Sequence, residues 1–193
     1  MDETIKNQIS ETIETHKKMV AELQADAFEV IGAAAEMITN SLKDGGCVYI
    51  CGNGGSAADA QHIAGEFVGR FRRERKALAA IALSTDTSVM TSVANDYGFD
   101  KVFARQLEAL AEKGDVLWAI STSGNSANIL EAARLAKKKG LGILAFTGKA
   151  KSKLETIADL CFCANNDSVA RAQEIHQIAY HIICDIVEQN FCE

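Results

Sequence analysis

The feature that most restricts the fold of this chain is a regular alternation of short apolar runs with longer helical patterns. The apolar runs have the length of β-strands and cover residues 47–51, 77–83, 116–120, 143–146 and 160–163. The helical patterns between and after them cover residues 57–69, 87–95, 99–113, 127–139, 151–157 and 168–190. Strands that alternate with helices predict a parallel sheet with helices on both faces. We therefore predict an α/β fold, a three-layer αβα sandwich whose five-stranded sheet has the flavodoxin-like order 2-1-3-4-5.

Two further helical patterns precede the first strand, over residues 2–24 and 25–43. In each of them the residues of one face recur at spacings of three and four: Ile5, Ile9, Ile13, His16, Val20 and Leu23, then Phe28, Ile31, Ala35, Ile38 and Leu42. Two long helices are more than one small domain needs to cover its sheet. We predict a single domain over residues 1–193, in which residues 1–43 pack in the core of an oligomer and residues 44–193 form the sandwich.

Composition and charge exclude several classes of protein. A chain of 193 residues is long enough for one α/β domain with a substantial core. A formal net charge of −6 argues against a nucleic-acid surface, and it means that an anionic substrate needs a local electropositive site. No signal peptide opens the chain and no run approaches the ~20 apolar residues of a membrane span, so we expect a cytoplasmic protein. The six cysteines form no Cys-x-x-Cys pair, and we expect buried thiols rather than disulfides or a metal site.

A turn rich in hydroxyl groups follows the third apolar run. Ser121, Thr122, Ser123 and Ser126 lie between that strand and the helix over 127–139, and Ser126 is a natural N-cap. Free backbone N–H groups and the positive end of the helix dipole favour an anion here. The turn has no Lys and no Gly-Lys-Ser/Thr, which excludes a nucleotide P-loop. We predict a site for one phosphate monoester; the alternative is a turn that merely caps its helix.

A second loop of small residues, 52–56, follows the first strand. In the order 2-1-3-4-5, strands one and three are neighbours at the switch point, where ligands bind beyond the carboxyl ends of the strands. Both loops therefore border one crevice. Gly52-x-Gly54-x-x-Ala57 also matches the dinucleotide fingerprint loosely, but no acidic residue follows at the required place after the second strand. A dinucleotide site is thus the weaker alternative.

Imidazole, carboxylate and amide side chains share faces on two predicted helices. His62 and Glu66 form an i,i+4 pair, and Gln173, Gln177 and His181 share a face of the last helix. Together they offer ligands for a Zn²⁺-type ion, or Glu66 and His181 form an acid/base couple. For the first pair, the alternative is an ordinary surface ion pair. The basic run over 70–76 is either a solvated loop or supplies a cation to the phosphate.

Four motifs follow one another along the chain: Cys51-Gly-Asn-Gly-Gly-Ser-Ala-Ala-Asp-Ala-Gln-His62, Ala94-Asn-Asp-Tyr-Gly-Phe99, Ile120-Ser-Thr-Ser-Gly-Asn-Ser126 and Arg171-Ala-Gln-Glu-Ile-His176, with His181 beyond. In this order they resemble the sugar isomerase (SIS) domain family and, within it, the phosphoheptose isomerases. The resemblance implies an aldose–ketose isomerase that converts sedoheptulose 7-phosphate into D-glycero-D-manno-heptose 7-phosphate. That reaction is the first step of bacterial ADP- or GDP-heptose synthesis for surface glycans. The resemblance also implies a homotetramer with the N-terminal helices in a central bundle and active sites at subunit interfaces.

The roles of single residues follow from the same resemblance. It implies that the sugar contacts Asn53, Gly54, Gly55, Ser56, Asn95 and Asp96, and that the phosphate is held by Ser121, Thr122, Ser123 and Ser126. One zinc ion per subunit would be bound by His62, Glu66, Gln173 and His181, and Glu66 and Gln173 would also contact substrate. Glu66 would move a proton between C1 and C2 through an enediol, while His181 handles the oxygen-bound proton.

Two other functions compete with this one. A paralogue group of the same family binds the bacterial replication initiator without isomerase chemistry. That group lacks the carboxylate and the histidine at the positions of Glu66 and His181, so the enzyme is favoured. An isomerase of another phosphosugar is the second alternative, because no loop residue visibly reads the length of the sugar.

Overall fold

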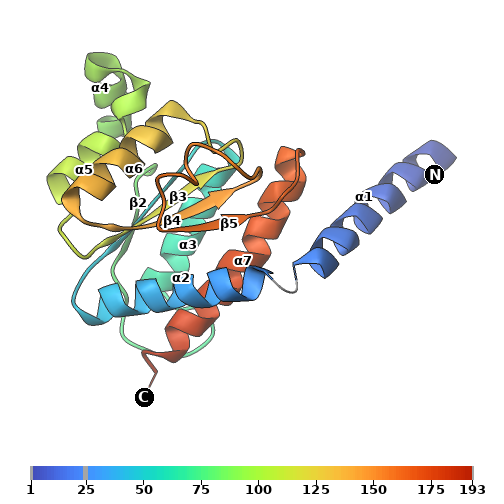
Figure 1. Cartoon of the computed structure of the whole chain (residues 1–193), viewed down its shortest axis with the longest axis horizontal. Coiled ribbons are helices and arrows are strands. Elements are labelled where there is room, and N and C mark those ends of the chain that lie inside the picture. Colours follow the sequence, from blue (N-terminus) through green and yellow to red (C-terminus); the bar gives the residue numbers. More distant parts are fainter. Residues whose placement is uncertain (1, 24–25, 193) are drawn as a thin grey trace.

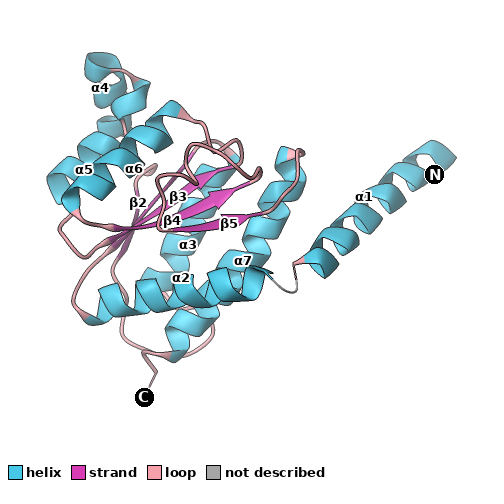
Figure 2. Ribbon diagram, viewed as in Figure 1, coloured by secondary structure: helices cyan, strands magenta, loops and turns pink. Residues whose placement is uncertain are grey.

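A parallel sheet lies between two layers of helices, as Figures 1 and 2 show. The computed structural model describes residues 2–23 and 26–192. Among these residues, parallel strands pair in the order β2-β1-β3-β4-β5. The predicted three-layer sandwich and its flavodoxin-like order are therefore confirmed. The strands are β1 (Val48–Gly52), β2 (Ala80–Ala82), β3 (Val116–Ser121), β4 (Gly142–Thr147) and β5 (Leu160–Cys163).

The helices divide between the two faces of the sheet. Residues of α2, α3 and α7 pack on one face, and residues of α5 and α6 pack on the other. None of the described helices combines the length and the apolar character needed to cross a membrane. The helices are α1 (Glu3–Glu22), α2 (Asp26–Lys43), α3 (Gly55–Val68), α4 (Thr87–Tyr97), α5 (Ala104–Leu110), α6 (Ala127–Lys139) and α7 (Val169–Gln189), with a short 3₁₀ helix, η1 (Phe99–Lys101).

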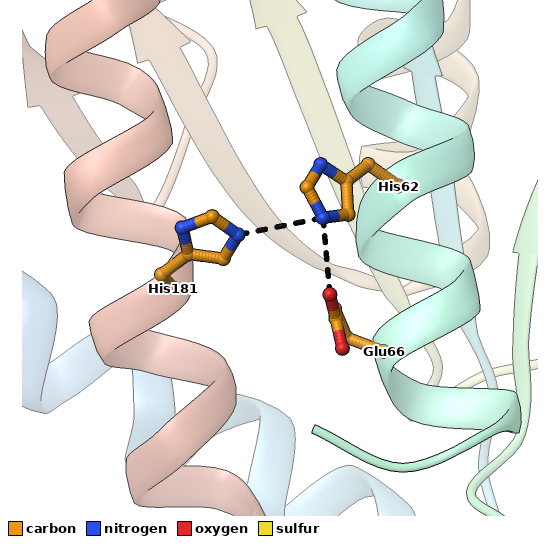
Figure 3. A group of neighbouring side chains, drawn as sticks. All are labelled: His62, Glu66 and His181. Carbon is orange, nitrogen blue, oxygen red and sulfur yellow. Dashed lines mark hydrogen bonds and ion pairs between the residues drawn. The ribbon is translucent and has the colours of Figure 1, made fainter. Parts of the chain in front are cut away.

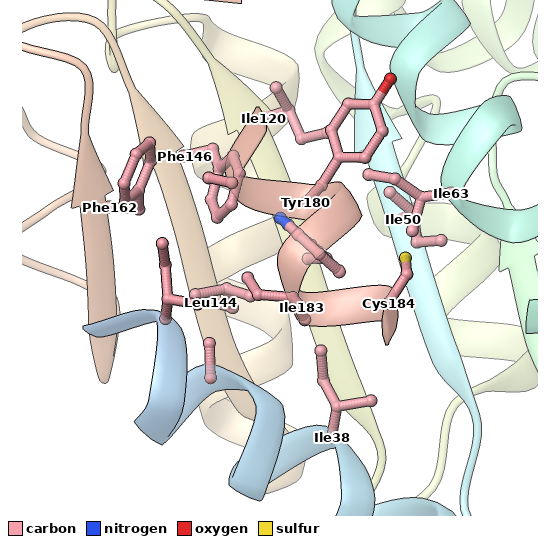
Figure 4. Packing of buried hydrophobic residues seen from close by; sticks show 14 of the residues in the cluster. Ile38, Ile50, Ile63, Ile120, Leu144, Phe146, Phe162, Tyr180, Ile183 and Cys184 are labelled. Carbon is pink, nitrogen blue, oxygen red and sulfur yellow. The ribbon is translucent and has the colours of Figure 1, made fainter. Parts of the chain in front are cut away.

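Alternation along the strands sends successive side chains into two separate cores. Trp118 packs in the core with α2, α3 and α7, whereas its neighbour Leu117 packs with α5 and α6. Figure 4 shows the first core, where Ile38, Ile63 and Ile183 bring the three helices against the sheet. Burying a side chain of this size contributes about 1.5–3 kcal/mol. The positions of α3 and α7, which carry the candidate catalytic residues, are thus set mainly by apolar packing.

The two N-terminal helices differ in how they meet the rest of the chain. On α2, Ile31 and Ile38 are buried in the core. We predicted that Phe28 shares their face, but it is 68% exposed, so this part of the prediction is wrong. Helix α1 extends away from the sandwich (Figure 1), and Ile5 and Ile9 on it are 49% and 47% exposed. A stripe of exposed isoleucine side chains is typical of a surface that packs on another chain.

The predicted helix over 99–113 is wrong in its extent, because η1 and a shorter α5 occupy this segment. The carboxylate of Asp115, which is 6% exposed, accepts the backbone N–H of Glu112 at 2.8 Å and that of Cys47 at 2.8 Å. An N–H group bound to this carboxylate cannot continue the i→i−4 ladder of an α-helix. A hydrogen bond to a side chain three residues ahead therefore ends the helix early, and the same carboxylate is held by the distant N–H of Cys47.

Two other predicted elements also differ from the structure. Residues 151–157 form turns and not a helix, because the N–H of Leu154 donates to the carbonyl of Gly124 at 3.0 Å, across to the Ser-rich turn. The predicted strand over 77–83 is reduced to Ala80–Ala82. It lies at the edge of the sheet and pairs only with β1, and Ile81 in its middle is 40% exposed.

The six cysteines are free thiols, as we predicted, but they are not all buried. Cys51 and Cys184 are buried, and desolvation raises the pKa of both thiols well above the ordinary value. The other four are half-buried. The expectation of buried thiols therefore holds for Cys51 and Cys184 alone.

Candidate active site

A pocket opens at the carboxyl ends of β1 and β3, at the switch point of the sheet. It is formed by the two loops that follow these strands and by the first turns of α7. It therefore brings together most of the residues predicted to bind the phosphosugar. The lining residues are Asn53, Gly54, Gly55, Ser56, Ile120, Ser121, Thr122, Ser126, Val169 and Gln173.

Two helices begin at this pocket, and neither first turn is capped by the side chain of its N-cap residue. Gly54 precedes α3, and Ser126 precedes α6 without accepting a capping hydrogen bond. The predicted capping role of the Ser126 hydroxyl is therefore wrong. The positive ends of two helix dipoles make this place favourable for an anion, although the N–H groups of Ser56 and Ala57 in α3 already donate to the carbonyls of Asn53 and Gly54.

The hydroxyl groups of the Ser-rich turn gather beside these helix starts. The Oγ atom of Ser121 lies 3.2 Å from that of Ser126 and 3.4 Å from that of Ser123. Ser123 is exposed and is not among the residues that line the pocket. Ser121, Thr122 and Ser126 are thus better placed for an anion than Ser123.

A pair of asparagines joins the two loops of the pocket. Asn53 and Asn128 exchange two amide hydrogen bonds, of 2.9 and 2.8 Å, and Asn128 is 3% exposed. We predicted that Asn53 contacts the sugar, but its amide is already paired within the chain. Sequence reasoning missed Asn128; a polar residue in the first turn of α6, next to the Ser-rich turn, was the only available signal.

Two glycines of the first loop make close contacts, and space requires glycine at Gly52. A Cβ atom on Gly52 would lie 2.3 Å from the backbone oxygen of Ser56, so a side chain cannot enter without moving the loop. A Cβ atom on Gly55 would lie 2.5 Å from Nε2 of Gln173. The absence of a side chain at Gly55 leaves room for the Gln173 amide of α7 beside the start of α3.

His62, Glu66 and His181 point toward one another between α3 and α7 (Figure 3). Nε2 of His62 lies 3.0 Å from Oε1 of Glu66 and 3.4 Å from Nε2 of His181. The hydroxyl of Tyr180 lies 3.0 Å from Nδ1 of His62. Burial, and then the neighbouring His62, lowers the pKa of His181, while the Glu66 carboxylate opposes this shift. These surroundings favour the neutral imidazole that a metal ligand or a general base requires.

The donor set fits a divalent transition metal such as zinc. One nitrogen from each imidazole and one oxygen of Glu66 lie within 4.8 Å of one another. Two histidines and a carboxylate, with a fourth position left open, are typical of catalytic zinc sites. Tyr180 can accept the remaining N–H of His62, which is the kind of outer hydrogen bond that orients a metal-binding histidine.

Gln173, the fourth expected ligand, lies nearer the start of α7 than His181 does. Its side-chain amide lies against Gly55 at the pocket. Eight residues separate it from His181, which corresponds to about 12 Å of helix rise. The structure therefore places Gln173 at the substrate pocket, about two turns of α7 before His181.

Asn95 and Asp96 are not brought to the pocket within one chain. They lie at the end of α4, which projects from the sandwich beside α5 and α6 (Figure 1). Both are exposed, and the amide of Asn95 donates to the carboxylate of Asp96 at 2.8 Å. Neither residue lines the pocket.

The basic run after α3 is largely engaged with carbonyls and carboxylates of its own chain. Arg73 pairs with Asp185 on α7, and the side chain of Arg75 is fully buried. No residue of this run is among those that line the pocket. Sequence reasoning missed the buried partner of the run, Glu188, because nothing in the helical pattern of α7 distinguishes it from a surface carboxylate.

Comparison with known proteins shows the family to which the chain belongs. The sequence model of the SIS domain matches residues 12–148 of the chain. The phosphoheptose isomerase of Roseiflexus sp. is 49% identical over 177 residues, which cover 92% of this chain and 88% of that protein. That of Campylobacter concisus is 47% identical over 187 residues, which cover 97% of this chain and 98% of that protein.

A solved structure gives the same result in three dimensions. The phosphoheptose isomerase of Neisseria gonorrhoeae superposes with a TM-score of 0.91 at 38% identity, covering 96% of this chain and 99% of that one. The chain therefore belongs to the SIS domain family and, within it, to the phosphoheptose isomerases.

Proposed function

We propose that this protein isomerises sedoheptulose 7-phosphate to D-glycero-D-manno-heptose 7-phosphate through an enediol. The observation that carries the proposal is the His62–Glu66–His181 group on the two helices that also border the phosphate-type pocket. Relatives named phosphoheptose isomerase, similar over nearly the whole chain, support the same reaction. A function restricted to binding the replication initiator is not favoured, because both groups needed for proton transfer are present.

In this proposal the pocket binds the phosphate and the helices supply the proton transfers. Ser121, Thr122 and Ser126 hold the phosphate together with the positive N-terminal ends of α3 and α6. The Glu66 carboxylate removes the proton at C1 and returns it at C2. His181, whose lowered pKa favours the neutral imidazole, moves the proton between the two oxygens.

We also propose that His62, Glu66 and His181 hold one zinc ion, with Gln173 as a further ligand in the substrate complex. Zinc supplies a Lewis acid that stabilises negative charge on the substrate oxygens. A carboxylate shared with zinc is a weaker base, so the assignment of Glu66 is the part of this proposal that most needs a test.

The active form is proposed to be a homotetramer. The exposed isoleucine stripe of α1 needs a partner surface, and Asn95 and Asp96 lie outside the pocket of their own chain. A neighbouring subunit would cover the isoleucine stripe of α1, and Asn95 and Asp96 would reach the substrate bound by a neighbouring subunit. The cytoplasmic location stays a prediction from the sequence.

Proton-exchange NMR on sedoheptulose 7-phosphate in D₂O tests the reaction. We expect solvent deuterium at C2 of a new aldose, and loss of that signal after chelation. Turnover that continues after complete chelation would contradict the zinc proposal. Absence of turnover, with or without added Zn²⁺, would reject this substrate, and the same assay with other ketose phosphates would then identify an alternative isomerase.

A further inference from the structure

The loop after α3 is fixed by a buried carboxylate that the proposed reaction does not use. Glu188, in the last turn of α7, is 1% exposed. Its two oxygens accept the backbone N–H groups of Phe71, Arg72 and Arg73 at 2.8, 2.8 and 2.9 Å. A carboxylate is unfavourable at the negative end of a helix dipole and in a buried site, so these donors must offset both costs.

Arg75 connects the same carboxylate to the end of α3. Its Nε atom lies 3.5 Å from Glu188, and its guanidinium donates to the carbonyls of Glu66 at 2.7 Å and Phe67 at 2.9 Å. The last carbonyls of a helix have no hydrogen-bond donors within the helix, and the guanidinium of Arg75 supplies donors to two of them. Burial by itself raises the pKa of Glu188, but the N–H donors and Arg75 hold it below its ordinary value, so the carboxylate stays charged.

Phe71 is the point at which this network reaches the candidate catalytic residues. Its ring stacks on the imidazole of His181, with centroids 5.6 Å apart and an angle of 25° between the planes. Tyr180 and His62 meet the same imidazole edge-on, at 4.6 and 5.0 Å. The χ2 torsion of histidine has broad minima, so the ring needs neighbours to fix its orientation. Phe71 is the one of these three that is held by a loop and not by a helix.

We propose that Glu188 and Arg75 form a latch that, through the ring of Phe71, orients the imidazole of His181 for proton transfer. The proposal rests on the role assigned to His181 above. Phe71, Arg75 and Glu188 are positioning residues, because none of them lines the substrate pocket. Misorientation of His181 should therefore reduce kcat while leaving the binding of the phosphate, and with it KM, nearly unchanged.

The decisive comparison is between Phe71→Leu and Phe71→Tyr in the full-length protein. Leu keeps apolar bulk but removes the ring, whereas Tyr keeps the ring. We expect Phe71→Leu to lower kcat about tenfold with KM changed by less than about threefold, and Phe71→Tyr to retain kcat. Phe191→Leu is the matched control, since Phe191 is also a half-buried phenylalanine packed against the same core. Glu188→Gln should lower kcat as Phe71→Leu does.

A second readout does not depend on turnover. With histidine labelled by ¹³C at Cε1, the His181 signal, assigned from its loss in His181→Gln, should carry the ring-current shift of the stacked Phe71. We expect that shift to disappear in Phe71→Leu and to persist in Phe71→Tyr and Phe191→Leu. This measurement decides the positioning even if wild-type protein fails to isomerise sedoheptulose 7-phosphate.

Three results would overturn the proposal. One is an unchanged His181 signal in Phe71→Leu. Another is an equal loss of kcat in Phe71→Leu and Phe191→Leu, which indicates general loosening of the core. The third is a Glu188→Gln protein that melts normally and keeps both kcat and the His181 signal, which would show that the latch is not needed.

Discussion

The pocket at the sheet edge and the His62–Glu66–His181 group lie on the same helices but are built in different ways. Most of the pocket comes from two continuous loops whose backbone is fixed by β1 and β3, and the first turns of α7 complete it. The three side chains come from two helices far apart in the sequence, and they meet only because α3 and α7 pack side by side on the sheet. Binding at the pocket therefore depends mainly on local backbone geometry, whereas the proposed proton transfer depends on helix packing.

Glu66→Gln should give the largest effect, and it should affect proton transfer by the group between α3 and α7. The amide cannot take up the proton, so kcat should fall by roughly 10²–10⁴-fold with little change in KM. Steady-state kinetics measures both values. Glu112→Gln, at an exposed glutamate ahead of β3, should leave them unchanged. Activity retained in Glu66→Gln would remove Glu66 from the mechanism.

Acid should weaken the attachment of α7 to the sheet. His176 is fully buried, its Nε2 lies 2.9 Å from the carbonyl of Thr147, and burial lowers its pKa from 6.5 to about 4. Below pH 6.5 the unfolded chain therefore binds a proton that the folded chain does not. The free energy of unfolding should fall as the pH falls from 6.5 toward 4, by on the order of 3 kcal/mol. Denaturation with urea at several pH values measures this loss.

The variant His176→Gln keeps an N–H donor for Thr147 but does not titrate. Its free energy of unfolding should depend less on pH between 4 and 6.5 than that of the wild type. Identical pH dependence in the two proteins would mean that other groups, such as the buried Glu188, account for acid sensitivity.

Chelation should act on the group between the helices and leave the pocket intact. When the free metal concentration is 100 times Kd, binding adds about 2.7 kcal/mol to the free energy of unfolding. Removal of the metal should therefore lower Tm by several degrees, and it should also reduce turnover. Calorimetry with and without chelator, followed by addition of Zn²⁺, measures the effect. His62→Gln should show little response to chelator. A wild-type Tm that chelation does not change would argue against a bound metal.

Ser121→Ala should give the smallest effect, and it should affect phosphate binding in the pocket. Loss of one hydroxyl to the phosphate should raise KM about tenfold, which corresponds to about 1.4 kcal/mol, with kcat nearly unchanged. Ser123→Ala is the matched comparison, because Ser123 is exposed and does not line the pocket, and its KM should change less. A larger effect in Ser123→Ala would reverse the assignment of the two hydroxyls.

The strand order, the two loops at the switch point and most of the residues that line the pocket follow from the sequence alone; Ile120 and Val169 also line it and were not predicted. The reason is that strand and helix periodicity, together with Gly- and Ser-rich turns, are local properties, and parallel strands place their following loops at one edge. The pairing of His62 with Glu66 was visible for the same reason, since i,i+4 spacing fixes it within one helix.

Long-range contacts overrule these local patterns at several points. The carbonyl of Gly124 accepts the N–H of Leu154, so one predicted helix is absent, and Asp115, which is held by the distant N–H of Cys47, accepts the N–H of Glu112 and ends α5 early. The meeting of His181 with His62, and the burial of Glu188 beneath the basic loop, depend on how α7 packs against α3. A hydrogen bond to a distant residue satisfies a backbone group as well as a local one does, and the sequence pattern does not reveal which one the folded chain uses.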